Sequence, residues 1–423
     1  MAMPAIARYA SLGPSLWSFE NVPDGTSIEP IPVLAQDGGE SQGMLFSRGG
    51  ERVVAMFMHP RGDMQRHYAM PFLLQAGIAT WGQAGRYINN DINCIKERLL
   101  LDIAAAIAKL RDRGFERVVL VGNSGGGALF TFYQSQASMK PPARLRDTAA
   151  GEPLDLNTYV MEPADAIVQL ATHLGEGKLM EVIIDPSVVD ENDPLSVDPT
   201  LDMYAPGNGF VPLPHTSSYS ETFLARYRQA QRQRILKIDA IARGFIAEQH
   251  YYLAKVGAPG FESLPLAERQ WCERRGFLGR YIEIHRTEAN LAYTDLSISP
   301  NARAIGSFFS PRPDILNFME AGFGKYQTPR AWLSTWSGAS SRASTLDCVR
   351  HVTVPTLVIS YDGDNAVMPC DTDAIFEASP ALTKHHFRVR GDHLGYGPQG
   401  ASDRSGQREA SRIISSWIAE QFG

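Results

Sequence analysis

The stretch VVLVGNSGGGALF, from Val118 to Phe130, decides the fold class. An apolar run of the kind that is buried on both faces of a sheet leads into a polar, glycine-rich corner, and a second apolar run follows. A strand, a tight turn and a helix in this order are typical of a parallel α/β sheet. Ser124 lies where the chain must turn, so we expect its hydroxyl to be exposed and rigidly held.

Residues 122–126 read G-N-S-G-G and match the pattern G-x-S-x-G, which requires a strand before the serine and a helix after it. The glycines two positions before and after the serine allow the strand and helix to pack closely. A phosphate-binding turn and a purely structural turn are the alternative interpretations. The glycines miss the G-x-G-x-x-G register and no G-x-x-x-x-G-K occurs, which disfavours phosphate binding.

Short apolar runs alternate with longer amphipathic runs from about residue 28 to residue 138, which is the rhythm of strands joined by crossover helices. Residues 29–35 and 42–47 predict a hairpin at the sheet edge. Residues 94–114 repeat apolar side chains every four positions and end at Gly114, which predicts a helix with one face on the sheet. Further strands are predicted over residues 53–59, 78–83, 118–123, 354–360 and 384–390, and further helices over residues 371–379 and 408–422.

The rhythm breaks at about residue 175, where a segment rich in Pro, Asp and Gly predicts turns. A long helix should follow a capping box formed by Ser218 and Glu221, and further helix is expected through Ala267 to Glu288. The predicted organisation is a parallel-sheet core interrupted by a mainly helical insertion. Its parts are an N-terminal arm (1–27), the first part of the core (28–174), a cap insertion (175–350) and the second part of the core (351–423).

Polar residues follow two of the later predicted strands at the points where those strands end. Asp362 and Asp364 come after residues 354–360, and His393 comes after residues 384–390. The carboxyl ends of parallel strands meet at one edge of the sheet, so these side chains should lie near Ser124. A serine hydroxyl becomes a good nucleophile only when a base removes its proton and a third group orients that base.

These residues resemble the landmarks of the α/β-hydrolase superfamily: the G-N-S-G-G corner, the P-T-L-V-I strand leading to G-D-x-x-V, and the G-D-H turn. The resemblance covers residues 28–172 and 354–422 and indicates no particular family within the superfamily. It implies Ser124 as the nucleophile, His393 as the general base and then acid, and Asp364 as the orienting carboxylate. Asp362 is the alternative carboxylate, but Asp364 lies three positions before Val367, as the family pattern requires.

The resemblance also implies two hydrogen-bond donors for the oxyanion of a tetrahedral intermediate. One is the backbone N–H of Gly125. Residues 59–63 resemble the family's H-G-x-G loop, with Pro60 in place of the glycine. Proline has no N–H, so the second donor is expected at Arg61, whose side chain we expect to be solvated rather than facing a substrate carboxylate. His59 is expected to shape this loop, and His173 to make an ordinary polar contact.

The composition excludes several classes of protein. Of 423 residues, 44% are hydrophobic and 20% charged, as in globular proteins, and the net charge of 40 − 46 = −6 disfavours nucleic-acid binding. No apolar segment approaches the roughly 20 residues of a membrane span. The N-terminus lacks the pattern of a secretory signal. The four cysteines are widely spaced, so we expect free thiols and a cytoplasmic protein.

No metal or cofactor is expected. The ten histidines form neither H-E-x-x-H nor H-x-H, and the adjacent His385 and His386 should face opposite sides of a strand. The acidic residues between 185 and 202 lack a calcium-loop pattern and fit turns. Six aromatic residues could line a hydrophobic pocket, and we expect most of them to belong to the core and a few to the pocket. The six are Tyr251, Tyr252, Phe308, Phe309, Trp332 and Trp336.

The function that the resemblance implies is cleavage of a small-molecule ester, lactone or thioester by a serine hydrolase through an acyl-enzyme. One alternative is carbon–carbon bond hydrolysis of a diketone-like substrate by the same triad. A second is a catalytically silent ligand-binding protein, because a fold does not by itself fix a function. The expected partner is a small-molecule substrate, with no nucleic acid and no membrane, and a homo-oligomer remains open.

Overall fold

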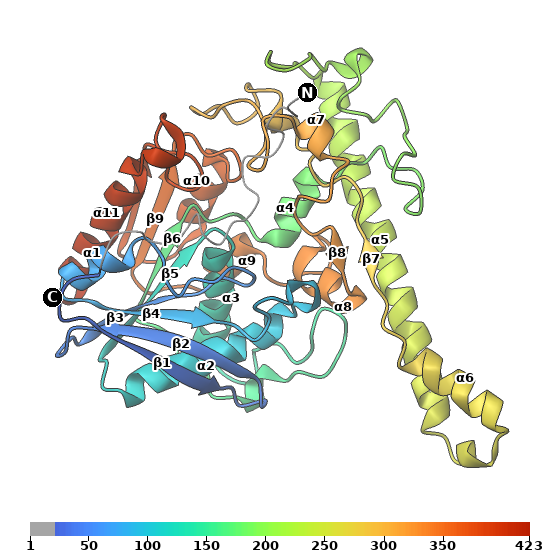
Figure 1. Cartoon of the computed structure of the whole chain (residues 1–423), viewed down its shortest axis with the longest axis horizontal. Helices are drawn as coiled ribbons and strands as arrows, with labels where there is room; N and C mark the ends of the chain where they lie inside the picture. The colour runs from blue at the N-terminus through green and yellow to red at the C-terminus, as the bar shows by residue number, and fades with distance from the viewer. Residues whose placement is uncertain (1–21) are drawn as a thin grey trace.

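The computed structural model describes residues 22–423, so most of the predicted N-terminal arm lies outside the described residues. An eight-stranded sheet has the order β1-β2-β4-β3-β5-β6-β9-β10 and helices on both faces (Figure 1). This is the predicted fold class, a mostly parallel sheet flanked by helices. The strands are β1 (Ser27–Leu34), β2 (Glu40–Ser47), β3 (Val53–Phe57), β4 (Ala79–Ala84), β5 (Arg117–Asn123), β6 (Ala166–Leu170), β9 (Thr356–Tyr361) and β10 (Lys384–Val389).

Among residues 22–423, the only antiparallel pairings in this sheet are those of β2, with β1 and with β4. The five pairings from β4 to β10 are all parallel. The predicted hairpin at the sheet edge is therefore confirmed, as are the five other predicted strands. Because the parallel strands share one direction, their carboxyl ends, which carry the candidate site residues, lie at one edge.

The strand residues alternate between two buried layers, as the period of two requires. Val54 and Met56 of β3 pack in the layer that contains α2 (Lys96–Asp112) and α3 (Gly125–Ser138). Ala55 and Phe57 point to the opposite layer. That layer contains the helices α1 (Met70–Gln75) and α11 (Ser405–Phe422). Each large side chain that is fully buried in such a layer contributes about 1.5–3 kcal/mol.

Helix α2 confirms the amphipathic helix predicted over residues 94–114. Its apolar stripe, including Leu99 and Ile103, is wholly buried. The chain leaves the helix at Gly114, whose φ of +92° lies in the left-handed region. Glycine adopts that conformation without a steric penalty, which explains why the helix ends there. The closing helices α10 (Pro369–Ala378) and α11 also lie where the sequence predicts them.

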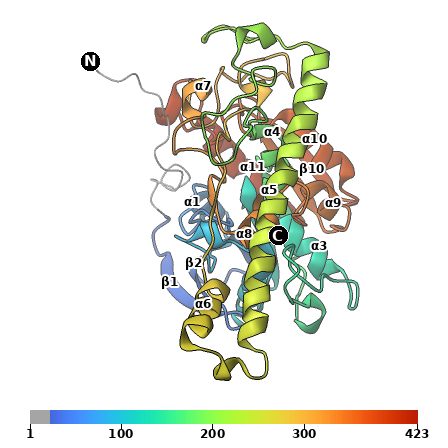
Figure 2. The ribbon, with the colours of Figure 1, turned by 90° about the vertical axis from the view of Figure 1, so that its right-hand side faces the viewer.

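The chain between β6 and β9 adds a long helical arm to the sheet. Helix α4 (Glu176–Ile183) leads, after a stretch of turns, to the 36-residue helix α5 (Glu221–Val256). In Figures 1 and 2 α5 runs along one side of the molecule and α6 (Leu266–Gly276) lies against its far end. That this segment forms a cap is a proposal, which rests on its position in the chain between β6 and β9.

The start of α5 differs from the prediction by two residues. The Oγ of Ser220, rather than Ser218, accepts a hydrogen bond from the N–H of Phe223, so Ser220 is the N-cap. The predicted capping box of Ser218 and Glu221 is therefore wrong. Ser218 belongs to the preceding turn, where its N–H donates to the carbonyl of Gly209.

The helix predicted through Glu288 ends at Gly276 instead. The following segment is extended and pairs β7 (Ile282–Glu283) with β8 (Tyr326–Gln327). Tyr281 is exposed while Ile282 and Ile284 are buried, and this alternation of two residues belongs to a strand. The amino-acid composition of this segment is typical of a helix, which is why the sequence predicts helix there rather than a strand with a period of two.

The predicted turns between residues 185 and 202 are confirmed. Aspartate side chains there accept N–H groups two residues further along, as from Ser187 to Asp185 and from Asn192 to Asp190. Such local bonds favour turns over helix. Among residues 22–423, no helix has both the length and the apolar composition that crossing a bilayer requires.

Candidate active site

Ser124 lies at the corner between β5 and α3, with backbone angles φ +53° and ψ −121°. A non-glycine residue adopts this conformation only when the surrounding packing imposes it. The packing is tight: a Cβ atom added at Gly126 would lie 2.3 Å from the carbonyl oxygen of Met58. A Cβ at Gly122 would lie 2.4 Å from Cα of Gly127. The glycines therefore allow strand and helix to approach, and this approach holds the serine in place.

The structure brings the three predicted triad residues together. Oγ of Ser124 lies 3.0 Å from Nε2 of His393, and Nδ1 of the same ring lies 2.8 Å from Oδ2 of Asp364. Ser124 follows β5, Asp364 follows β9 and His393 follows β10, so three strand ends supply the set. The geometry allows His393 to remove the serine proton while Asp364 holds the imidazole.

Asp364, not Asp362, is the carboxylate that contacts His393. The other oxygen of Asp364, Oδ1, accepts the N–H groups of Ala366 and Val367 at 2.7 and 2.8 Å. These bonds fix the carboxylate in the orientation that points Oδ2 at the ring. Asp362 instead accepts the N–H of Gly391 at 3.1 Å and thereby holds the turn before His393.

His393 is buried, and Phe308 lies edge-on to its ring with the centroids 5.0 Å apart. Burial by itself disfavours the imidazolium. The charge of Asp364 and its hydrogen bond outweigh that effect and raise the pKa of His393 above its ordinary value of 6.5. The ring is thus prepared to take up a proton when Ser124 loses one.

The two predicted oxyanion donors differ in their surroundings. Gly125 is the first residue of α3, and an N–H in the first turn of a helix has no intrahelical acceptor. The N–H of Arg61, by contrast, lies 3.1 Å from Nδ1 of His59 and that of Gly62 lies 2.8 Å from the same atom. The oxyanion role of Arg61 stays a prediction, and its N–H already has an acceptor.

The Arg61 side chain is not solvated on the surface, contrary to expectation. Only 18% of it is exposed, and its guanidinium carbon lies 5.3 Å from the ring centroid of Phe323 and 4.9 Å from that of Trp336. Its ion-pair partner Asp91 is 3.8 Å away. The aromatic rings hold a cation in the wall of the site, where it can attract an anionic substrate group.

A buried cluster behind Gly125 was not found from the sequence. Lys96 and Glu176 form a fully buried ion pair, and His173 lies beside the pair. Burial raises the pKa of Glu176, but the positive charge of Lys96 outweighs it and lowers that pKa to about 2. Burial lowers the pKa of His173 to about 4. The ion pair joins positions 80 residues apart, so no local pattern could indicate it.

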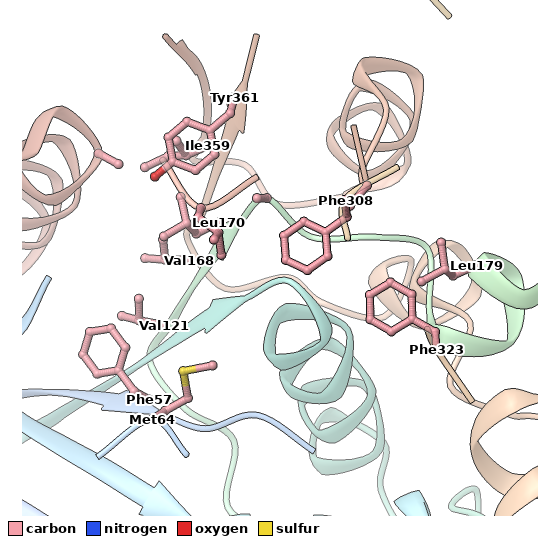
Figure 3. Close-up of a cluster of buried hydrophobic side chains, with 14 of the residues drawn as sticks. Phe57, Met64, Val121, Val168, Leu170, Leu179, Phe308, Phe323, Ile359 and Tyr361 are labelled. Carbon is pink, nitrogen blue, oxygen red and sulfur yellow. The ribbon is translucent and has the colours of Figure 1, made fainter. Parts of the chain in front are cut away.

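Ser124 and His393 open onto a cavity of about 390 Å³. Both the sheet core and the segment between β6 and β9 contribute to its walls, and Figure 3 shows Phe308 and Phe323 gathered beyond the ends of the strands. The lining residues are His59, Arg61, Gly62, Asp63, Met64, Ile88, Asn89, Asp91, Asn123, Ser124, Phe308, Phe323, His393 and Leu394.

The remaining candidates occupy ordinary positions. Of the six predicted aromatic residues, Phe308 lies in the cavity wall, whereas Trp332 and Trp336 are fully buried and Tyr251 is exposed on α5. His385 accepts a bond from Trp417, whereas His386 pairs with Ser360. Within the described part of the chain, no group of three or more His, Cys, Asp or Glu side chains could hold a metal ion.

Comparison with known proteins finds no matching family model and no matching curated protein. Among solved structures, DcsB in complex with its substrate analogue is 12% identical, with 93% of this chain and 99% of that chain covered and a TM-score of 0.46. The esterase domain of a Rhodothermus marinus protein is 9% identical, with 93% and 98% covered and a TM-score of 0.42. An esterase from Thermogutta terrifontis is 11% identical, with 93% and 98% covered and a TM-score of 0.39.

All three TM-scores are below 0.5, so the fold of this chain is assigned from its own structure and not from these similarities. The chain's own features are a mostly parallel eight-stranded sheet, a strained serine between β5 and α3, and a histidine and an aspartate at later strand ends. Serine, aspartate and histidine in that chain order, on a strand–serine–helix corner, are the landmarks of the α/β-hydrolase fold. The chain has the α/β-hydrolase fold.

Proposed function

We propose that the protein is a serine hydrolase that cleaves a small-molecule carboxylic ester, lactone or thioester through an acyl-enzyme. The observation that supports this proposal is the continuous set of hydrogen bonds from Ser124 through His393 to Asp364 at the cavity. Acyl transfer needs a nucleophile that is hydrogen-bonded to a base, and a carboxylate that orients the base. The cavity volume of about 390 Å³ is suited to a small molecule.

The proposed reaction has two halves. Oγ of Ser124 attacks the carbonyl carbon while Nε2 of His393 takes the hydroxyl proton, and the carbonyl oxygen becomes an oxyanion beside the N–H of Gly125. Collapse of this intermediate breaks the bond to the alcohol or thiol, which receives the proton from His393. A water molecule then attacks the acyl-enzyme and gives a proton to His393, which passes it to the departing Oγ of Ser124 as the acid is released.

The decisive experiment is to incubate the pure protein with a fluorophosphonate probe and with short p-nitrophenyl esters. We expect covalent labelling at Ser124 and ester hydrolysis. Ser124→Ala should abolish labelling, and Ser124→Ala and His393→Ala should each lower turnover about a thousandfold or more while the protein stays folded. Ser138→Ala is the matched control, because Ser138 is an exposed serine at the other end of α3.

Two outcomes would contradict the ester assignment. A folded wild-type protein that the probe does not label would favour the catalytically silent alternative. Turnover of vinylogous diketones without any turnover of esters would favour carbon–carbon bond hydrolysis, in which the same triad must also deliver a proton to a carbanion.

A further inference from the structure

The residues that follow His59 in the loop between β3 and α1 offer no free amide as the second oxyanion donor at positions 60, 61 and 62. Pro60 has no N–H, and the N–H groups of Arg61 and Gly62 both point to Nδ1 of His59. A single donor from Gly125 would stabilise the oxyanion incompletely, because each donor typically contributes a hundredfold or more in rate. A side chain of the cavity wall can supply the second donor in their place.

The same two bonds fix the tautomer of His59. An imidazole nitrogen that accepts N–H bonds carries no proton, so in the neutral ring the proton is on the other nitrogen, Nε2. Burial lowers the pKa of His59 to about 3, and the ring is neutral at physiological pH. His59 thus presents one N–H donor, at Nε2, in a fixed orientation.

That N–H lies against the residue that follows the nucleophile. A Cβ atom added at Gly125 would be 2.9 Å from Nε2 of His59, and His59 lines the same cavity as Ser124 and His393. Oε1 of Glu176 is equally near that position, at 2.8 Å, yet it is buried without a hydrogen-bond partner. The His59 N–H is therefore not directed at this carboxylate.

We propose that the Nε2–H of His59 is the second hydrogen-bond donor to the oxyanion, acting beside the N–H of Gly125. This inference rests on the proposed function, because an oxyanion forms only when Ser124 attacks a carbonyl. The Arg61 and Gly62 amides then act indirectly, as the groups that keep the proton of His59 on Nε2, the nitrogen beside Gly125. The ion pair with Lys96 balances the charge of Glu176, so this carboxylate repels the oxyanion less.

Two substitutions separate the two ends of the ring. In His59→Asn the side-chain oxygen can replace Nδ1 as the acceptor for the loop amides, but no donor reaches the position of Nε2. In His59→Gln the amide N–H can reach that position, while the acceptor for the loop is lost. We expect His59→Asn to lower kcat for a p-nitrophenyl ester about 100-fold or more with KM changed less than about threefold, and His59→Gln to retain more kcat. His351→Asn, at an exposed histidine, is the control.

Wild-type kcat in a folded His59→Asn variant would overturn the inference and leave a purely structural role for His59. The proposed function fails separately, when wild-type protein neither labels at Ser124 nor hydrolyses esters.

A second measurement does not depend on variant folding. Wild-type protein labelled with ¹⁵N-histidine is treated with a trifluoromethyl ketone, which forms a tetrahedral oxyanion adduct on Ser124. We expect the Nε2–H proton resonance of His59 to move downfield as the adduct forms. An adduct that forms without any change at this resonance would also overturn the inference.

Discussion

Ser124, His393 and Asp364 derive their proposed chemistry from their surroundings rather than from their residue types. The positive φ of Ser124 is maintained by glycines that let α3 approach β3 and β5. Two backbone amides fix Asp364, and Asp364 in turn fixes His393. Neighbouring Asp362 has the same side chain, yet it serves only the turn before His393.

The pH dependence of activity follows from the raised pKa of His393. The ring must be neutral to accept the serine proton, so activity should fall as the pH decreases through a pKa above 6.5. In Asp364→Asn the carboxylate charge that raises the pKa is gone and burial remains, so the acidic limb should move to lower pH. The rate should also fall about a thousandfold or more. Profiles of kcat/KM against pH measure both effects.

Asp362→Asn is the matched control for this prediction, because it changes the same side chain two positions away. We expect a much smaller loss of rate and an acidic limb that stays in place. A large loss of kcat/KM in Asp362→Asn together with a small loss in Asp364→Asn would reverse the assignment of the carboxylate.

At the scale of elements, the decisive contact is that of α3 with the ends of β3 and β5. Helix α3 begins with three glycines, and this composition lowers intrinsic helix stability while it permits the close packing. The sequence predicts both elements because their periods and the corner are local. The sequence does not predict the start of α5 or the end of α6 at Gly276 correctly. Several residues at each place fit a helical pattern, and tertiary contacts determine where the helix begins or ends.

Gly126→Ala should destabilise the protein by about 1–3 kcal/mol, because the new Cβ would overlap the Met58 carbonyl and push α3 from β3. Gly244→Ala is the control, since Gly244 lies in α5 with no atom within 4 Å of an added Cβ. It should stabilise the protein by up to about 1 kcal/mol. Urea unfolding measures both changes; a neutral Gly126→Ala variant would show that the corner can relax.

At the scale of the whole molecule, buried polar contacts connect the sheet core to the segment between β6 and β9. Lys96 of α2 pairs with Glu176 of α4, and Oγ1 of Thr335 donates a hydrogen bond at 2.9 Å to the carbonyl of Cys94, just before α2. Because these polar groups are buried away from water, each depends on its partner for a hydrogen bond or a counter-charge. Such contacts join the segment between β6 and β9 to the helix layer of the sheet core.

Lys96→Met should lower the free energy of unfolding by about 3–5 kcal/mol, because it leaves the Glu176 carboxylate buried without its counter-charge. The double variant Lys96→Met with Glu176→Gln should recover a large part of this loss, since no charge then remains. Thermal and urea unfolding of both variants provide the comparison. A Lys96→Met variant as stable as wild type would contradict this expectation.

The sequence by itself determined the parallel-sheet fold, the serine corner and the strand ends that carry the candidate residues. These features depend on apolar periodicity and turn-forming residues close together in the chain. Only the tertiary structure decided which of Asp362 and Asp364 contacts His393, where the Arg61 side chain lies, and that Lys96 pairs with Glu176. The reason is physical: these contacts join segments remote in the chain, and their distances depend on how the whole molecule packs around the cavity.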